Sequence, residues 1–157
     1  MAKAREIPGL EASSPFREAA ADAVWVRTEE VFSFREGVLD ISDIERVHDM
    51  RVATRRLRAV LEVFEPCFPR RPHRAALRDV KRLADALGER RDPDVHVDAL
   101  ARISEGLGEA DAPGIESLTA ALRADQRAAN KELARVLDEV DSGNLEGRLL
   151  MLAEMAR

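Results

Sequence analysis

Residues 48 to 58 read HDMRVATRRLR and place one histidine and four arginines within eleven positions. Arginine stays charged at physiological pH, and its planar fork of N–H donors fits two oxygens of a phosphate or carboxylate at once. A protonated histidine beside such oxygens supplies a further donor. The chemistry that this segment suits is therefore the binding of an anion.

The basic segment belongs to a chain whose formal net charge is -5. Residues 46–91 carry 13 Lys and Arg against 6 Asp and Glu, a net charge of +7. The remaining residues carry 12 against 24, a net charge of -12. The charge is thus divided along the sequence, and residues 46–91 are the part that would attract an anionic partner.

A helix through residues 48–58 would separate its cations from its apolar residues. At 100° per residue, four cationic side chains fall within about 80° of one another along about 15 Å of helix. These four are His48, Arg51, Arg55 and Arg58. The opposite side carries Met50, Ala53, Leu57, Val60, Leu61 and Phe64. Arg56 lies on the flank, and Glu62 interrupts the basic stripe near its end, so the helix is expected to pack through one face and bind through the other.

A second, weaker basic stripe is expected on the next helix, where Asp85 dilutes it. Its members are Arg74, Arg78, Lys81 and Arg82. If the two helices pack antiparallel across their short connection, both stripes border a common groove. Arg90 and Arg91 would then lie at the end of that groove, near the positive N-terminus of a following helix.

The elements that would position these residues are all helical. Ser42 or Asp43 can cap the basic helix, and Pro66 ends it. Gly88 is expected to end the next helix, and Asp92 with Pro93 to begin another. The predicted helices span about residues 14–35, 43–65, 72–88, 92–107, 114–140 and 145–155. Phe16, Val24 and Trp25 are expected in the core, and the class is all-α, an antiparallel bundle of about five to six helices.

Length and composition agree with one intracellular domain. At 157 residues the chain can bury a core by itself, with residues 1–12 as a flexible leader and 13–157 as a single helical bundle. The single cysteine, Cys67, excludes an internal disulfide and fits a reducing compartment. No apolar run approaches the roughly 18 residues of a membrane span. We therefore expect a cytoplasmic protein.

Neither catalysis nor metal binding is favoured by the residues. His48, Asp49, His73 and His96 give no recognisable ligand spacing, and clustered arginines repel cations. No phosphate-cradling glycine loop, nucleophile elbow or carboxylate pair is present. Asp92 and Asp94 read better as helix-capping residues than as catalytic ones. We expect no enzyme activity, no metal and no cofactor.

The segment VHDMRVATRRLRAVLEVF, followed by LADALGERRDPDVHVDAL, resembles the CHAD family, the conserved histidine α-helical domain. The resemblance implies binding of inorganic polyphosphate in a basic channel between helical bundles, and targeting to polyphosphate granules. The positions that match the family's motifs are His48, Arg51, Arg55, Arg56, Arg58, Lys81 and Arg91. We add four arginines to the expected binding residues on other grounds. Arg74, Arg78 and Arg82 belong to the second basic stripe, and Arg90 lies beside Arg91.

The chain departs from the family in one respect. Typical members are about twice as long, and a second bundle repeats the His/Arg helix to close the channel. No such repeat follows residue 100. The chain is then either one bundle with an open groove or one of two copies that pair to rebuild the channel. A symmetric dimer is the simplest way to bring two identical basic surfaces together, so of the two we expect the homodimer.

Two other kinds of function remain open from the sequence. Arginine forks bind the phosphates of nucleic acid as well, although aromatic residues for stacking and polar residues for reading bases are absent from the basic stripe. The acidic outer helices could instead dock on a partner protein. Competition between polyphosphate and DNA would separate these alternatives.

Overall fold

The computed structural model describes residues 3–157, and their regular structure is entirely helical. The helices are α1 (Phe16–Phe32), α2 (Ile44–Val63), α3 (Arg70–Ser104), α4 (Ala112–Ser142) and α5 (Leu145–Glu154). One-turn 3-10 helices at Glu65–Cys67 and Glu109–Asp111 lie in two of the connections. The predicted all-α class is confirmed. Residues 1 and 2 of the predicted leader lie outside the described residues, and residues 3–15 precede α1 without regular structure.

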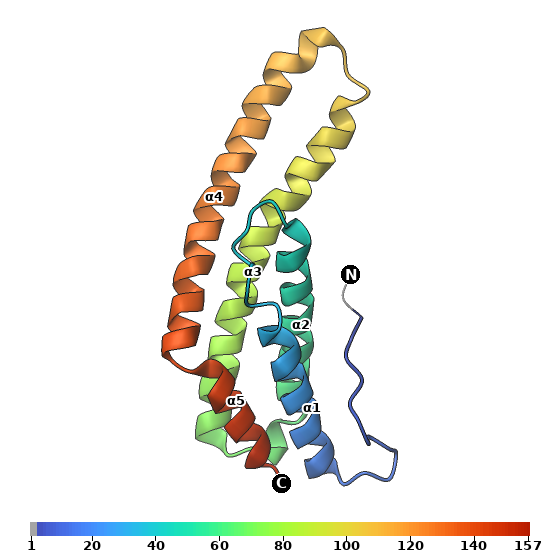
Figure 1. Cartoon of the computed structure of the whole chain (residues 1–157), viewed down its shortest axis with the longest axis vertical. Helices are drawn as coiled ribbons and strands as arrows, with labels where there is room; N and C mark the ends of the chain where they lie inside the picture. The colour runs from blue at the N-terminus through green and yellow to red at the C-terminus, as the bar shows by residue number, and fades with distance from the viewer. Residues whose placement is uncertain (1–2) are drawn as a thin grey trace.

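A long antiparallel hairpin, α3 and α4, forms the spine of the molecule (Figure 1). Helix α2 packs on α3, and α1 packs on both α2 and α5. These three shorter helices surround only the lower part of the hairpin in this view, and the upper part extends beyond them. The bundle is therefore complete at one end of the hairpin and missing at the other.

The core is built from aliphatic side chains, as the scarcity of aromatic residues predicts. Helix α2 contributes Met50, Ala53, Leu57 and Leu61, all buried, which confirms the predicted packing face. Trp25 packs against the core and is half-buried. Phe16 is 57% exposed, so its assignment to the core is wrong. It lies at the first residue of α1, where its ring contacts Phe64 at 4.9 Å between centroids.

The N-terminus of α2 follows the sequence signals closely. Asp43 is the N-cap, and its carboxylate accepts a hydrogen bond from the backbone N–H of Arg46 at 3.3 Å. The other candidate cap, Ser42, instead contacts the side chain of Asp40. The cap fixes where the first turn of α2 begins, and it therefore sets the angular position of the arginines that follow.

Helix α3 is one continuous helix of 35 residues, so the predicted break between Gly88 and Pro93 is wrong. Proline inside a helix costs about 3 kcal/mol and glycine about 1 kcal/mol relative to alanine. Packing overrides both penalties, because Pro93 is buried and Gly88 faces Arg51 of α2. No helix begins at Asp92, and the anion site expected at such an N-terminus does not exist.

A buried ion pair in α3 joins three segments of the chain at this point. Arg90 donates to Asp94, and both side chains have no exposed surface. Arg90 Nε also donates to Asn130 Oδ1 of α4 at 2.9 Å, and Gln126 Nε2 donates to Asp94 Oδ1 at 2.6 Å. Asn130 in turn donates to the carbonyl oxygen of Leu39, in the connection between α1 and α2, at 3.0 Å. Asp94 is therefore a buried partner of Arg90 and not a capping residue.

Replacing Asp94 by alanine should lower the free energy of unfolding by about 3–5 kcal/mol, because it leaves the Arg90 guanidinium buried without its counter-ion. Asp98 and Arg102 form the matched control, since they make the same i, i+4 pair at 2.7 Å on the exposed side of the same helix. Asp98→Ala should change the free energy by about 0.5 kcal/mol or less. Chemical denaturation followed by circular dichroism measures the free energy of unfolding of both variants. Equal decreases would contradict the stabilising role of the buried Arg90–Asp94 pair.

Candidate functional site

An open groove lies between α2 and α3 and has a volume of about 440 Å³. Its α2 wall consists of Arg51, Arg55 and Arg58. Its α3 wall consists of Ala84, Asp85, Gly88, Glu89 and Asp92. The arginines stand at i, i+4 and i+7, so one helix face presents all three. The structure thus brings together three of the four residues of the predicted outward stripe.

Two of the groove arginines have no acidic partner within residues 3–157. Arg51 is half-buried and Arg55 is exposed. Gly88 leaves room beside Arg51, since a Cβ placed there would lie 3.9 Å from its Nε. Both guanidinium groups therefore keep their donors available for an anion in the groove.

The end of the groove carries a shared ion pair. Arg58 Nε and Lys81 Nζ each lie 3.1 Å from Glu62 Oε1. Hydrogen bonds from Arg58 first, and then from Lys81, lower the pKa of the Glu62 carboxyl below its usual value. Glu62 therefore holds one cation from each helix at neutral pH, and an anion must compete with it for both.

The α3 wall of the groove is acidic, although a second basic stripe is expected there from the sequence. Asp85, Glu89 and Asp92 stand at i, i+4 and i+7, and all three are exposed. No ion pair to another side chain of residues 3–157 neutralises them. The signal in the sequence was their spacing, which continues the Arg78 and Lys81 face of α3 by one and two further turns. That face changes from positive to negative between Arg82 and Asp85, so the expectation of two basic walls is wrong.

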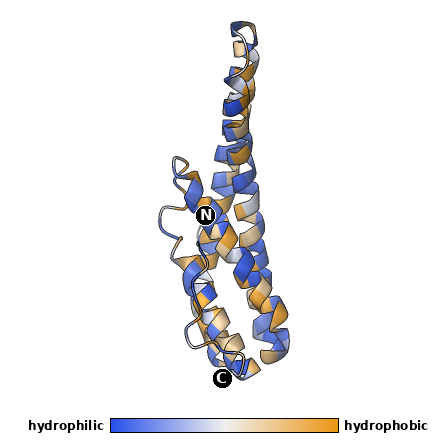
Figure 2. Cartoon of the chain, turned by 90° about the vertical axis from the view of Figure 1, so that its right-hand side faces the viewer, coloured by the Kyte–Doolittle hydropathy of each residue, from blue (hydrophilic) through white to orange (hydrophobic). Residues whose placement is uncertain are grey.

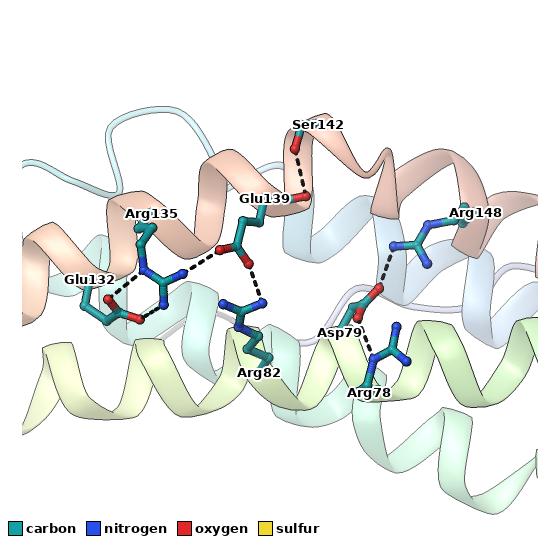
Figure 3. Close-up of polar contacts among 8 residues, drawn as sticks. All are labelled: Arg78, Asp79, Arg82, Glu132, Arg135, Glu139, Ser142 and Arg148. Carbon is teal, nitrogen blue, oxygen red and sulfur yellow. Dashed lines mark hydrogen bonds and ion pairs between the residues drawn. The ribbon is translucent and has the colours of Figure 1, made fainter.

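The basic residues of the first half of α3 lie outside the groove. Arg82 forms an ion pair with Glu139 of α4, and Glu139 also binds Arg135 at 2.5 Å (Figure 3). Arg78 contacts the neighbouring Asp79 at 3.2 Å. Arg74 is exposed and has no ion pair within the described part of the chain. Of this stripe, only Lys81 approaches the groove arginines, through Glu62.

Asp79 and Arg82 also line a second, smaller cavity between α3, α4 and α5, of about 130 Å³. Arg148 of α5 enters it and donates to Asp79 at 2.7 Å. Each charged side chain that lines this cavity already has a partner of opposite charge, as Figure 3 shows. The cavity therefore serves the packing of α5 on the hairpin more than the capture of an ion.

Three other predicted site residues hold helices together. Arg56 reaches across to α1 and binds the buried carboxylate of Glu30 at 2.8 Å. Arg90 is the buried partner of Asp94. Arg91 is half-buried and donates to the carbonyl oxygen of Ile44 at 3.2 Å, at the first residue of α2. The structure places these three arginines apart from the groove.

His48 lies on α2 one turn before Arg51 and is half-buried. It is not among the residues that line the groove. The remaining histidines differ in their surroundings. His73 is buried and bonded through Nε2 to the carbonyl oxygen of Leu61 at 2.8 Å, whereas His96 is exposed. A role for His48 in binding stays a prediction.

The sequence and the fold of this chain are both similar to those of known proteins. The family model described as the CHAD domain matches residues 22–156. The crystal structure of the CHAD domain from the plant Ricinus communis is similar to this chain, with a TM-score of 0.73 and 26% sequence identity. The match covers 96% of this chain and 50% of the plant chain, so this chain spans about half the length of that relative. No curated protein sequence matches this chain.

The pKa of Glu62 should respond to the loss of either cation. Arg58→Ala and Lys81→Ala should each raise it toward the usual glutamate value, with the larger rise for Arg58→Ala, because each removes a donor to the carboxylate. Side-chain carboxyl shifts followed by NMR during a pH titration measure the effect. Arg102→Ala, distant from Glu62 in sequence and paired with Asp98, is the control and should leave the pKa unchanged.

Proposed function

Because this chain belongs to the CHAD domain family, we propose that it binds inorganic polyphosphate along the groove between α2 and α3. The observation that carries the proposal is the pair Arg51 and Arg55. Both point into one open groove, and neither has an acidic partner among residues 3–157. A helix face that holds like charges one turn apart is destabilised by a few tenths of a kcal/mol per pair. An anion in the groove would remove that repulsion.

The ligand chemistry follows from the shape of the arginine wall. Arg51, Arg55 and Arg58 extend along about 10 Å of α2, and their forks can each take two oxygens. A linear polyanion of repeated phosphates presents oxygens along such a track without needing aromatic stacking. Release of its counter-ions would supply much of the affinity, as it does for nucleic acids, so binding should weaken steeply with salt.

Three further cations would extend the track. Lys81 and Arg58 become available when phosphate oxygens replace the Glu62 carboxylate between them. Arg74 is exposed about two helical turns before Lys81 on α3. His48, one turn before Arg51 on α2, would add a further donor to phosphate oxygens. The track thus runs along α2 and crosses to α3 near Glu62.

The proposed role is binding without catalysis. Among the described residues, no helix is long and apolar enough to cross a membrane. A protein that binds polyphosphate through arginine side chains would accumulate where the polymer is concentrated. We therefore propose that it localises to polyphosphate granules in the cytoplasm. Nucleic acid is the second candidate ligand, because the same forks bind any phosphate chain.

Charge reversal in the arginine wall should abolish binding. Arg51→Glu combined with Arg55→Glu replaces two free cations by anions in the groove, so the affinity for long-chain polyphosphate should fall by at least about 100-fold at low salt. Fluorescence anisotropy with labelled polyphosphate measures it, and the dependence of affinity on salt should become shallower in the variant.

The control for this variant changes the net charge equally at a distance from the groove. Lys3→Glu combined with Arg102→Glu alters two exposed cations, one before α1 and one near the end of α3. Its affinity should stay within about twofold to threefold of the original. An equal loss of polyphosphate affinity in both variants would show that only the net charge of the protein matters. Tighter binding of DNA than of polyphosphate would favour nucleic acid as the ligand.

Neutralising the acidic wall should strengthen binding. Asp85→Asn with Glu89→Gln removes two unpaired anions that face the arginines, so the affinity for polyphosphate should rise about threefold to tenfold at low salt. Helicity should be unchanged because both side chains are exposed. Glu11→Gln with Glu146→Gln makes the same charge change at two exposed positions that do not line the groove, one before α1 and one in α5, and should have little effect. Unaltered affinity after neutralisation would mean that the ligand does not enter between the two walls.

A further inference from the structure

The upper part of the α3–α4 hairpin lacks the helices that complete the bundle below it. We call residues 95–125 the arm. Helix α2 begins level with Arg91, as the contact between Arg91 and the Ile44 carbonyl oxygen shows, so α2 does not reach the arm. In Figure 1 the arm extends as two helices beyond α1, α2 and α5, and in Figure 2, where the two helices overlap, the same part of the hairpin projects beyond the rest of the molecule.

The arm has no core of its own. No residue from 95 to 132 is buried, whereas buried residues recur along the hairpin below Asp94 and from Leu133 onward. Four large apolar side chains of the arm are 45–60% exposed. They are Val95, Ile103, Leu107 and Leu118. Helices depend on packing of an apolar face for most of their stability, and two alone bury little.

The charges of the arm are arranged at opposite ends. Its tip carries the exposed acids Glu105, Glu109, Asp111 and Glu116, with no basic residue between Ile103 and Leu122. At the base of the arm and in the two turns of α4 below it lie three exposed basic residues, Arg123, Arg127 and Lys131, and one exposed acid, Asp125. None of these eight side chains forms an ion pair within residues 3–157. The tip therefore offers uncompensated negative charge, and this part of α4 offers a net positive charge.

We propose that the arms of two copies pack side by side in antiparallel orientation and form a four-helix bundle. A two-fold axis would then place the acidic tip of each arm beside the basic base of the other, and the contact occurs twice. The exposed apolar side chains would become the core of the new bundle. The parallel arrangement is disfavoured, because it brings two acidic tips together.

The charges argue for a second copy of this chain as the occupant, because each copy supplies both an acidic tip and the basic residues that the tip would contact. The arm gives the homodimer expected from the sequence a defined interface, and this assembly does not depend on the proposed polyphosphate binding.

Sedimentation equilibrium of the 157-residue chain tests the assembly directly. The chain should behave as a species of twice the 17.5 kDa monomer mass. Ile103→Glu with Leu118→Glu should weaken dimerisation at least tenfold, because it sets charge in the new core. Val63→Glu is the control, since Val63 is 65% exposed but lies at the end of α2, away from the arm. It should leave the dimer intact.

A charge swap tests the antiparallel orientation. Glu109→Lys with Asp111→Lys makes the tip basic, and Arg127→Glu with Lys131→Glu makes the base acidic. Each variant alone should dimerise at least tenfold more weakly, and an equimolar mixture should recover a mixed dimer. Recovery also shows that both variants fold.

Three results would overturn the proposal. They are a monomer at all concentrations, a dimer that resists the arm substitutions, and a mixture of the charge variants that stays monomeric. Polyphosphate affinity measured on the same samples separates this proposal from the ligand assignment, because a monomer that binds polyphosphate refutes only the dimer.

Discussion

The buried pair between Arg90 and Asp94 is the constraint on which the rest of the structure depends. It ties α3 to α4 through Gln126 and Asn130, and Asn130 fixes the connection that leads into α2. A charged pair without exposed surface requires a fixed geometry, because neither ion can be left unpaired in the core. The packing around this pair keeps α3 continuous across Gly88 and Pro93. Helix α2 is thereby held against α3 with its arginines facing outward.

Sequence reasoning succeeded where local rules decide the outcome. The class, the capping of α2 by Asp43 and the division of α2 into an apolar and a basic face all follow from periodicity and capping signals. It failed at Gly88 and Pro93, where local signals indicate a break. There, tertiary packing stabilises the helix by more than the penalties of those two residues. That information lies in α4 and in the α1–α2 connection, distant in the sequence.

The candidate site was predictable in part for the same reason. Spacing on one helix was enough to group Arg51, Arg55 and Arg58. It could not tell that Arg56 and Arg90 reach buried acids on α1 and α3, because a cation's partner depends on how helices pack. The acidic half of the α3 face was visible as a spacing, yet its meaning required knowing which residues of α2 it opposes. The sequence of one helix thus predicts on which face a charged side chain lies, but its partner is known only once the neighbouring helices are placed.

The unbroken course of α3 has a geometric consequence. A single helix carries the acidic wall of the groove and also one side of the arm, and the buried Arg90–Asp94 pair lies where the two segments meet. Because no break separates the segments, the direction of the arm and the direction of the acidic wall are set together. The placement of that wall is therefore a property of the whole hairpin.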